Sequence, residues 1–433
     1  MAIFGTLAGS FEVSGDYPTV RPTLNLNFAR SRALDPRITF SRTSVGTYVG
    51  RDGLVKTAGN NEPRFDHDPS TLDSLGLMIE RERTNLIVYS VINTAHWNTN
   101  TSTNTNNTTE TKAPDGSNTA FKYVPNNGGT GWVSVYNTGD VISMTSGTTY
   151  AYSVWAKPTH SDFTGFRING DIRDGGGINI SANFVLSGDG SVSGTYDSAK
   201  ITKYPNGWYR CEATGTADAT TTEEPAFQTS AAGDGTKGFY VWGYQIEVGK
   251  YSTSYIPTSG ATVTRSVETA TINNLEWFNK PGPGTIFIEG DVIGEEQNTA
   301  SSSYCGFATS NNDNFAYFLT YDNRTNVGFT TPSGGNISKY HDLATVSRFK
   351  SAHAWDSLAD ANTTGTAAID GDIYGSYAWQ ISGTQDPNNY IKFGIGRAAR
   401  NITTHNVITG HVAHISYYPA RLTSAQLQQI TTL

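Results

Sequence analysis

The sequence predicts an all-β protein in which a small amino-terminal β module is followed by two β-sandwich (jelly-roll) domains. The first observation is that short segments of alternating apolar and polar residues recur between turns rich in glycine, asparagine and aspartate. The second is composition, because only 16% of the 433 residues are charged while glycine occurs 45 times and tyrosine 23 times. Such a composition favours strands and polar turns, and the length allows about two to four domains.

Changes in this pattern divide the chain into four segments. Residues 1–23 are predicted to form an arm, because their glycines and prolines leave little apolar surface to bury. This arm is either disordered or docks on a neighbouring subunit. A β module is predicted over residues 24–85, a jelly roll over 86–265 and a second β-sandwich over 266–433.

The module over 24–85 is more charged than the rest of the chain. Its strands are indicated by LNLNF, which starts at Leu24, and by a hairpin with Asp52-Gly53 in its turn. We interpret the charged residues as ion pairs that hold together a unit with a small core, rather than as a catalytic site. The expected partners are Arg30, Arg37, Arg42, Arg64, Arg81 and Arg83 with Asp35, Asp66, Asp68, Glu80 and Glu82.

Strands of the first sandwich are predicted at jelly-roll spacing. They cover 131–136, 148–157, 163–168, 178–186, 192–196, 207–216, 226–230 and 239–248. The last strand, FYVWGYQIEV, is apolar on both faces and is expected to be fully buried. Beyond it Pro257 keeps the chain extended, so we expect an exposed strap that proteases cut between Ser252 and Asn274.

The second sandwich is indicated by further short strands and one helix. The strands are expected at 284–292, 327–331, 367–372, 391–396 and from residue 410 onward. The sequence predicts where the helix starts, because Thr423 can cap it and Gln426 occupies the reciprocal position of a capping box. Leu422 and Leu427 then supply the hydrophobic staple.

Three stretches resemble known families. The pattern WG-Q-E-G followed by TSYIPT-G, within 239–260, resembles the end of a carbohydrate-binding-module-like jelly roll in tailed-bacteriophage virion proteins. The run from LDPRITFSR through NEPRFDHDP to GLMIE is similar to an opening module of virion structural proteins of tailed phages, especially marine phages and cyanophages. The order of GTIFIEGDV, AAIDGD and GHVAHISYYPARLTSAQL resembles a laminin-G/concanavalin-A-like lectin domain.

Aromatic residues are the best candidates for a binding surface, because sugar rings stack on aromatic rings while their hydroxyls bond to nearby polar groups. In GWVSVY, Val133 and Val135 are assigned to the core, which leaves Trp132 and Tyr136 on the opposite face. The glycan-binding candidates are Trp132, Tyr136, Trp208, Tyr374 and Trp379. For each of them the alternative is packing in a core or an interface.

The spacing of the charged residues fits a catalytic site less well than the aromatic residues fit a binding surface. Glu289 and Asp291 share a strand face, but Glu295 lies one residue beyond the pattern of family 16 glycoside hydrolases, which have the concanavalin-A-like fold. His411 and His414 have an odd spacing that points them to opposite faces of a strand, which argues against zinc.

Metal and disulfide candidates are few. Asp370 and Asp372, on either side of Gly371, either bind calcium or form a turn. No other cofactor is predicted. Cys211 and Cys305 fall in different predicted domains, so no disulfide is expected between them.

The favoured interpretation is a non-enzymatic phage virion surface protein, a tail-appendage (fibre-like or spike-like) adhesin that binds host cell-surface saccharide. A head decoration or capsid-surface fibre protein is the alternative, and a glycan-degrading enzyme is the third. Expected partners are other virion proteins of the tail or head, in a homotrimer or another symmetric assembly. The net charge of −8 argues against nucleic acid, and no apolar run predicts membrane insertion or a signal peptide. We therefore expect synthesis in the host cytoplasm and a location on the virion surface.

Overall fold

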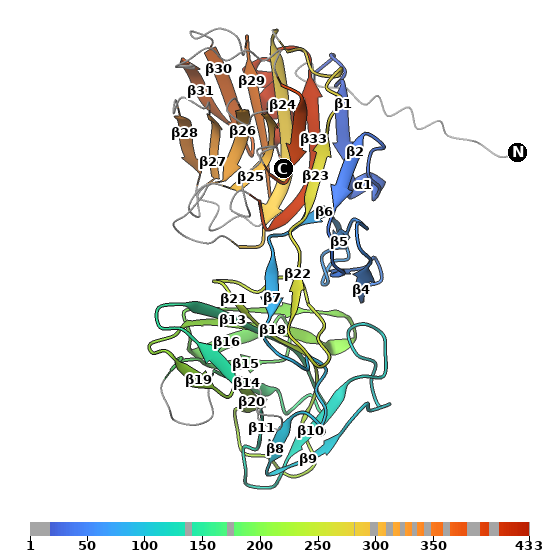
Figure 1. The fold of residues 1–433 in the computed structure, drawn as a ribbon, viewed down its shortest axis with the longest axis vertical. Helices are drawn as coiled ribbons and strands as arrows, with labels where there is room; N and C mark the ends of the chain where they lie inside the picture. The colour runs from blue at the N-terminus through green and yellow to red at the C-terminus, as the bar shows by residue number, and fades with distance from the viewer. Residues whose placement is uncertain are drawn as a thin grey trace, which may run out of the picture.

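The computed structural model consists of two β-sandwiches stacked along its long axis (Figure 1). It describes residues 18–134, 141–170, 177–280, 282–294, 302–308, 315–320, 325–330, 336–341, 348–357, 364–378, 390–397 and 407–432. A two-stranded ribbon of β7 (Arg83–Asn85) and β22 (Val263–Arg265) runs between the sandwiches. The all-β fold class predicted from the sequence is confirmed.

The first sandwich pairs two six-stranded sheets. Sheet one has the order β17-β18-β13-β21-β10-β9, formed by β17 (Ser198–Lys203), β18 (Tyr209–Thr216), β13 (Thr149–Pro158), β21 (Phe239–Val248), β10 (Phe121–Pro125) and β9 (Ser102–Thr105). Sheet two has the order β16-β15-β14-β20-β11-β8, formed by β16 (Ser191–Thr195), β15 (Ser181–Val185), β14 (Gly165–Asn169), β20 (Ala226–Thr229), β11 (Trp132–Ser134) and β8 (Asn98–Asn100). A short ribbon of β12 (Ile142–Met144) and β19 (Thr221–Glu223) lies beside them, and a 3-10 turn covers Pro205–Gly207. Every strand predicted here is present, although β8, β9, β10, β12, β17 and β19 were not predicted.

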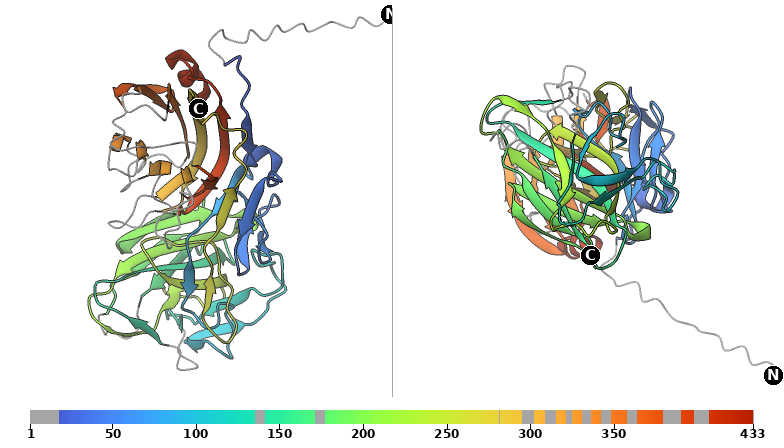
Figure 2. Two further views of the ribbon diagram at one scale, coloured as in Figure 1. Left: turned by 45° about the horizontal axis from the view of Figure 1, so that its top comes forward. Right: turned by 90° about the horizontal axis from the view of Figure 1, so that it is seen from below.

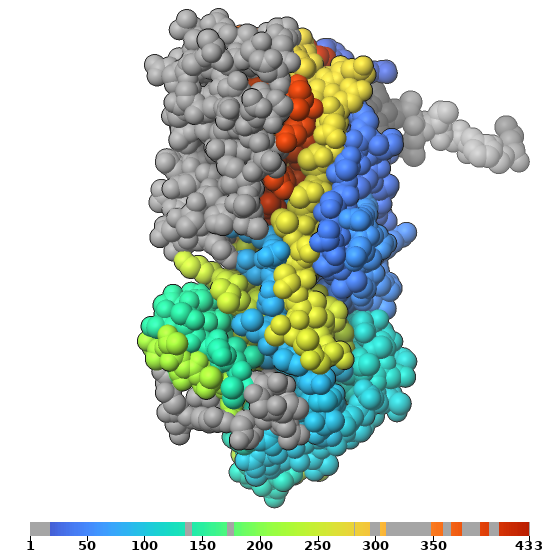
Figure 3. Space-filling model, in the orientation of Figure 1, coloured from blue at the N-terminus to red at the C-terminus, as the bar shows by residue number. Residues whose placement is uncertain are grey.

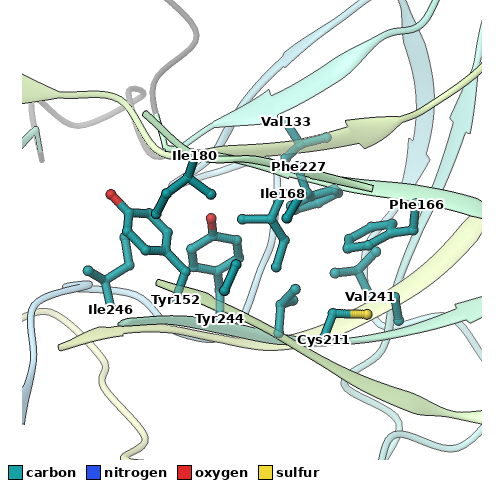
Figure 4. Close-up of a cluster of buried hydrophobic side chains, with 14 of the residues drawn as sticks. Val133, Tyr152, Phe166, Ile168, Ile180, Cys211, Phe227, Val241, Tyr244 and Ile246 are labelled. Carbon is teal, nitrogen blue, oxygen red and sulfur yellow. The ribbon is translucent and has the colours of Figure 1, made fainter. Parts of the chain in front are cut away.

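The inner faces of these two sheets form one apolar core (Figure 4). Alternate residues of most strands point inward, which is why the period of two in the sequence located the strands. In β21 the alternation shifts by one residue at Gly243, so that Val241 and Tyr244 both face this core. Sheet one contributes Tyr152, Cys211, Val241, Tyr244 and Ile246, and sheet two contributes Val133, Phe166, Ile168 and Phe227. The prediction that β21 is buried is confirmed along almost its whole length.

The second sandwich is built from an eight-stranded and a seven-stranded sheet. The first has the order β31-β30-β29-β24-β33-β6-β5 with β1 also on β33, formed by β31 (Asp372–Ala378), β30 (Thr364–Ile369), β29 (Arg348–Trp355), β24 (Gly284–Val292), β33 (Gly410–Tyr418), β6 (Ser74–Ile79), β5 (Phe65–His67) and β1 (Leu24–Asn27). The second has the order β2-β23-β32-β25-β26-β27-β28, formed by β2 (Ile38–Ser41), β23 (Thr269–Ile272), β32 (Lys392–Ile395), β25 (Ser302–Ala308), β26 (Phe315–Thr320), β27 (Thr325–Thr330) and β28 (Asn336–His341).

Two short helices complete the described fold. Helix α1 (Phe28–Ser31) follows β1, and helix α2 (Ser424–Thr431) follows β33. The predicted capping box of α2 is confirmed, because Thr423 and Gln426 exchange both expected hydrogen bonds. Neither helix in the described residues is long and apolar enough to span a membrane.

Residues 24–85 do not form the separate module expected from the sequence. Strands β1, β5 and β6 extend one sheet of the second sandwich, and β2 extends the other. Their apolar side chains, including Leu24, Leu26, Leu77 and Ile79, are buried in that sandwich's core. The hairpin of β3 (Gly46–Val49) and β4 (Val55–Ala58) packs against the first sandwich instead, so this segment joins both. Figure 2 shows these amino-terminal strands beside the carboxy-terminal ones.

A buried network of ion pairs fixes this join. Arg64 donates from Nε and Nη2 to the two oxygens of Glu268, at 2.8 and 2.5 Å, and lies 2.8 Å from Glu80. Arg42 contacts Glu268 at 2.7 Å, and Arg265 contacts Glu80 at 3.2 Å. All five side chains are fully excluded from solvent. Burial alone would raise the pKa of Glu80, but Arg265 and Arg64 hold it well below its usual range.

The strap expected to be exposed lies against this network. Thr253 and Tyr255 are 1% and 4% exposed, and Ser254 donates to both Glu80 oxygens, at 2.9 and 2.6 Å. The polar residues that made this stretch look like a linker are therefore partners of buried charges. Within the strap, only the turn at 259–262 and the pair Asn273 and Asn274 are continuously exposed. Figure 3 shows the strap (yellow) and the amino-terminal segment (blue) side by side along the molecule.

We predict that Glu268→Gln lowers the free energy of unfolding by about 3–5 kcal/mol, because it leaves Arg42 and Arg64 buried with one carboxylate fewer. Urea unfolding followed by tryptophan fluorescence measures this change. Asp35→Asn is the matched control, because it breaks a partly exposed pair with Arg37 and should cost less than about 1 kcal/mol. Equal losses in the two variants would contradict the role of the network.

Candidate functional site

A row of polar side chains around one tryptophan crosses the outer face of sheet two. Trp132 in β11 lies directly opposite Asn100 in β8 and Gln228 in β20. Gln228 lies opposite Arg167 in β14, and Arg167 lies opposite Asn183 in β15. Directly opposed residues project from the same face, so these five side chains form one continuous row. With strands about 4.8 Å apart, the six strands of this sheet span roughly 24 Å.

The core on the other side of the sheet creates this row. Val133, Phe227 and Ile168 are fully buried, so their sequence neighbours must face outward. The assignment of Val133 to the core is confirmed. Trp132 is half-buried, which leaves part of its ring accessible. Tyr136, its predicted companion, lies outside the described residues.

Arg167 is oriented within the row by its neighbour. Its Nε donates to Oδ1 of Asn183 at 2.5 Å. Among the described residues, no acceptor bonds to the two terminal nitrogens of this guanidinium. A planar fork with two open nitrogens can bind a carboxylate or two vicinal hydroxyls. The row therefore combines an aromatic ring, amides of Gln228 and Asn183, and one cation.

Sequence reasoning missed Asn100, Gln228, Arg167 and Asn183 as members of the site. The strands of the last three were predicted, and the alternation in AFQT, GFRIN and SANFV places them on the face opposite to core residues, whereas β8, which carries Asn100, was not predicted. The sequence does not show which residues of different strands lie opposite one another. The residues that become neighbours of Trp132 lie 32 to 96 positions away in the chain. Only the pairing of the strands brings them together.

Trp208 does not stand on an exposed face, contrary to the expectation from the sequence. Its side chain is 2% exposed, and its indole Nε1 donates to the carbonyl oxygen of Lys112 at 2.9 Å. It belongs to a second apolar cluster with Trp155, Trp242 and Tyr255, on the outer side of sheet one. Tyr209 and Cys211 of the adjoining strand β18 are buried in the core between the two sheets.

The aromatic candidates of the second sandwich are only partly described. The glycan-binding candidate Tyr374 lies in strand β31 and packs half-buried against Ala367 and Ile369. Trp379 lies outside the described residues.

Asp370 and Gly371 form the two-residue turn between β30 and β31, which is the non-metal alternative left open by the sequence. Both residues have positive φ, 47° and 87°, as such a hairpin turn requires. Oδ1 of Asp370 accepts a hydrogen bond from the backbone N–H of Lys350 at 2.8 Å, while Asp372 is exposed. Among the described residues, no group of three or more His, Cys, Asp or Glu is placed to hold a metal ion.

His411 and His414 lie on the same face of β33, contrary to the expectation of opposite faces. An irregularity in the pairing leaves Ala413 without an opposite residue, so His411 faces Asp291 and His414 faces Glu289. Nδ1 of His411 lies 2.7 Å from Asp291. Glu289 pairs instead with Arg348 at 2.9 Å, so the two carboxylates considered for catalysis each have a cationic partner.

His411 also links two parts of the chain. Its Nε2 lies 2.9 Å from Asp66 of β5, so one imidazole bridges two carboxylates. Burial alone would lower the pKa of His411, but Asp291 and Asp66 raise it to about 10. The imidazole is therefore a cation at neutral pH.

Comparisons with known proteins give distant likenesses only. No protein-family model and no curated protein matches the chain. The CBM40 module of the Ruminococcus gnavus IT-sialidase is 17% identical over 36% of this chain and 85% of that chain, with a TM-score of 0.28. The LG1-3 region of the laminin α2 chain is 12% identical over 64% and 62%, with a TM-score of 0.23. The CBM22 tandem domain of Paenibacillus barcinonensis Xyn10C is 9% identical over 80% and 99%, with a TM-score of 0.24. At these values no ligand or activity follows for this chain.

We predict that the His411 bridge makes stability fall as the pH rises. The pKa of His411 is about 10 in the folded protein and about 6.5 in the unfolded chain, so the bound proton favours folding. Its contribution is complete below pH 6.5 and is lost as the pH approaches 10. The difference in Tm between wild type and His411→Gln should shrink over this range in thermal melts. A difference that is constant with pH would contradict the bridge.

Proposed function

We propose that this chain is a non-enzymatic surface protein of a phage virion that binds saccharide of the host cell surface through the outer face of sheet two. The observation that supports the binding site is the row from Asn100 to Asn183, in which the half-buried ring of Trp132 lies among amides and a guanidinium. A sugar offers an apolar face for such a ring and hydroxyls for the flanking groups.

The layout of the chain supports a display role. The first described residues, at 18–23, lead into β1 of the second sandwich, whereas the row lies on the first sandwich. Thr253 bonds both to Glu247 of β21 and to Arg265 of the buried network, which ties the first sandwich to the segments that precede the strands of the second. An arm attached to the particle would therefore present the row away from the point of attachment.

Within the virion, we propose the tail rather than the head, as an appendage adhesin. Copies in a trimer or another symmetric assembly would combine individually weak saccharide contacts into firm adsorption, because linked sites bind at high effective concentration. Labelling of this chain on intact particles, imaged by electron microscopy, tests the placement. Label on the capsid shell would instead support the alternative role as a head decoration protein.

We predict that Trp132→Ala weakens binding to host-surface saccharide at least tenfold and leaves Tm nearly unchanged, because the ring lies on an outer face. Trp208→Ala is the matched control, because removing this buried ring should cost about 3–5 kcal/mol of stability. Binding to purified host glycans on an array, together with thermal melting, measures both effects. Unchanged binding by a folded Trp132→Ala variant would exclude the row.

We also predict that Arg167→Gln reduces binding to carboxylated saccharides by tenfold or more and affects neutral ones less. The open terminal nitrogens of Arg167 suit a carboxylate, and glutamine keeps polarity but removes the charge. Arg167→Lys should restore only part of the affinity, because an ammonium group cannot form the paired contact. An equal loss for neutral and acidic sugars would show that Arg167 does not select charge.

A further inference from the structure

A cleft of about 180 Å³ lies where the two sandwiches and the β3–β4 hairpin meet. We propose that this cleft is a second ligand site and that it takes one small, neutral, polyhydroxylated ring, such as a single pyranose. Its walls include Trp155 and Arg210 from sheet one, His67 at the end of β5, and Tyr255 from the strap. The row around Trp132 lies on sheet two, so the two sites would be independent.

The size of the cleft limits the ligand. A protein cavity of about 150 Å³ is large enough to admit benzene. The 180 Å³ of this cleft therefore has room for one six-membered ring with small substituents, but not for a disaccharide. An oligosaccharide could enter only by its terminal residue.

Three buried polar atoms of residues that line the cleft lack a partner among the described residues, namely Nε2 of His67, Nε of Arg210 and Nε1 of Trp155. Nδ1 of His67 lies 3.1 Å from the carbonyl oxygen of Val49, which can only accept, so Nδ1 carries the proton. In the neutral ring Nε2 is then an acceptor, and no described group donates to it. His67 is only 5% exposed, and leaving such an acceptor unsatisfied costs free energy.

Arg210 supplies the complementary unsatisfied atom. Its Nη2 donates to the hydroxyl of Ser153 at 3.1 Å and to the carbonyl of Thr253 at 2.6 Å. Its Nε is a buried donor without an acceptor among the described residues. Nε1 of Trp155 is a second such donor, and hydroxyl groups, which both donate and accept, can satisfy the one acceptor and the two donors together.

The remaining walls suit a ring that is neutral and partly apolar. The guanidinium of Arg210 lies 4.8 Å over the ring of Trp155, and Tyr204 and Tyr255 contact that indole edge-on. The charged residues at the cleft balance, with Asp66, Asp68 and Glu212 matched by Lys200, Arg210 and the imidazolium of His411. A positively or negatively charged ligand would bring a net charge into the cleft without an opposite charge to pair with it.

The ligand would enter at the edge of sheet one. Lys200 and Thr202 of edge strand β17 line the cleft and are exposed and half-buried, respectively. Beyond them, the hydroxyl of Ser70 donates to the carbonyl of Lys203 at 2.9 Å, which closes the cleft between the amino-terminal segment and β17. A large side chain at Thr202 would therefore block entry without touching the buried ion pairs.

The test is thermal melting of the full chain with a panel of monosaccharides, each compared with mannitol at equal concentration. We expect at least one monosaccharide to raise Tm by roughly 3 °C more than mannitol at saturation, and to shift tryptophan emission. Trp132→Ala should keep this response. Thr202→Trp should lose it while melting as wild type does, and His67→Phe should weaken it at least tenfold.

Several outcomes would overturn the proposal. They are no monosaccharide exceeding mannitol, a full response in Thr202→Trp, a full response in a folded His67→Phe, or a response that disappears in Trp132→Ala. The last result would assign the effect to the row on sheet two. Because Trp132→Ala separates the two sites, failure of this cleft leaves the test of the row unaffected.

Discussion

One carboxylate, that of Glu268, holds together parts of the chain that are distant in sequence. It accepts hydrogen bonds from Arg42 and Arg64, and from the backbone N–H of Glu80 at 3.0 Å. Burying an ion is costly, and the cost is offset only when its oxygens are well bonded. Here the partners come from the amino-terminal segment, while Glu268 itself lies near the carboxy-terminal end of the strap. The geometry that satisfies the charge therefore also fixes how the segments align.

The need to bond buried charges also explains why the join is held by many hydrogen bonds although its sequence resembles a linker. Glu247, at the end of β21, accepts from both the N–H and the hydroxyl of Thr253. Arg265 donates to the same threonine and to the carbonyl of Arg81 at 2.6 Å. Thr253 and Ser254 thus bond to charges that would otherwise be unsatisfied, and Thr258 bonds to Ser90, so the strap is bound along its length up to the turn at 259–262.

Local patterns predicted the strands well and predicted their partners poorly. The alternation that put Val133 in the core is a property of adjacent residues, and the structure agrees. The assignment of β1 was different, because Leu24 pairs with Tyr417 and nothing near residue 24 indicates that partner. For the same reason Trp208 looked exposed. Alternation predicts which residues point away from one core, but it does not predict whether another segment of the chain packs over them.

The two outer faces of the first sandwich consequently differ. The face of sheet one is covered by the strap, the β3–β4 hairpin and residues 112–120, which together bury Trp155, Trp208 and Trp242. The face of sheet two keeps its row of polar side chains, and there the one tryptophan is only half-buried. A cluster of aromatic residues thus marks the join between the sandwiches, and a single ring among amides marks the candidate binding surface.

The topology also constrains the order in which the protein can fold. All strands of the first sandwich lie between residues 98 and 248, so it can form as soon as that stretch has been synthesised. The second sandwich needs β1 and β33, whose paired residues are almost the full chain apart, and such distant contacts form slowly. During synthesis the edges of β1, β2 and β6 therefore remain unpaired until the first sandwich and the later strands have been made. Mutations in these early strands should increase chaperone dependence and aggregation more than mutations in the first sandwich do.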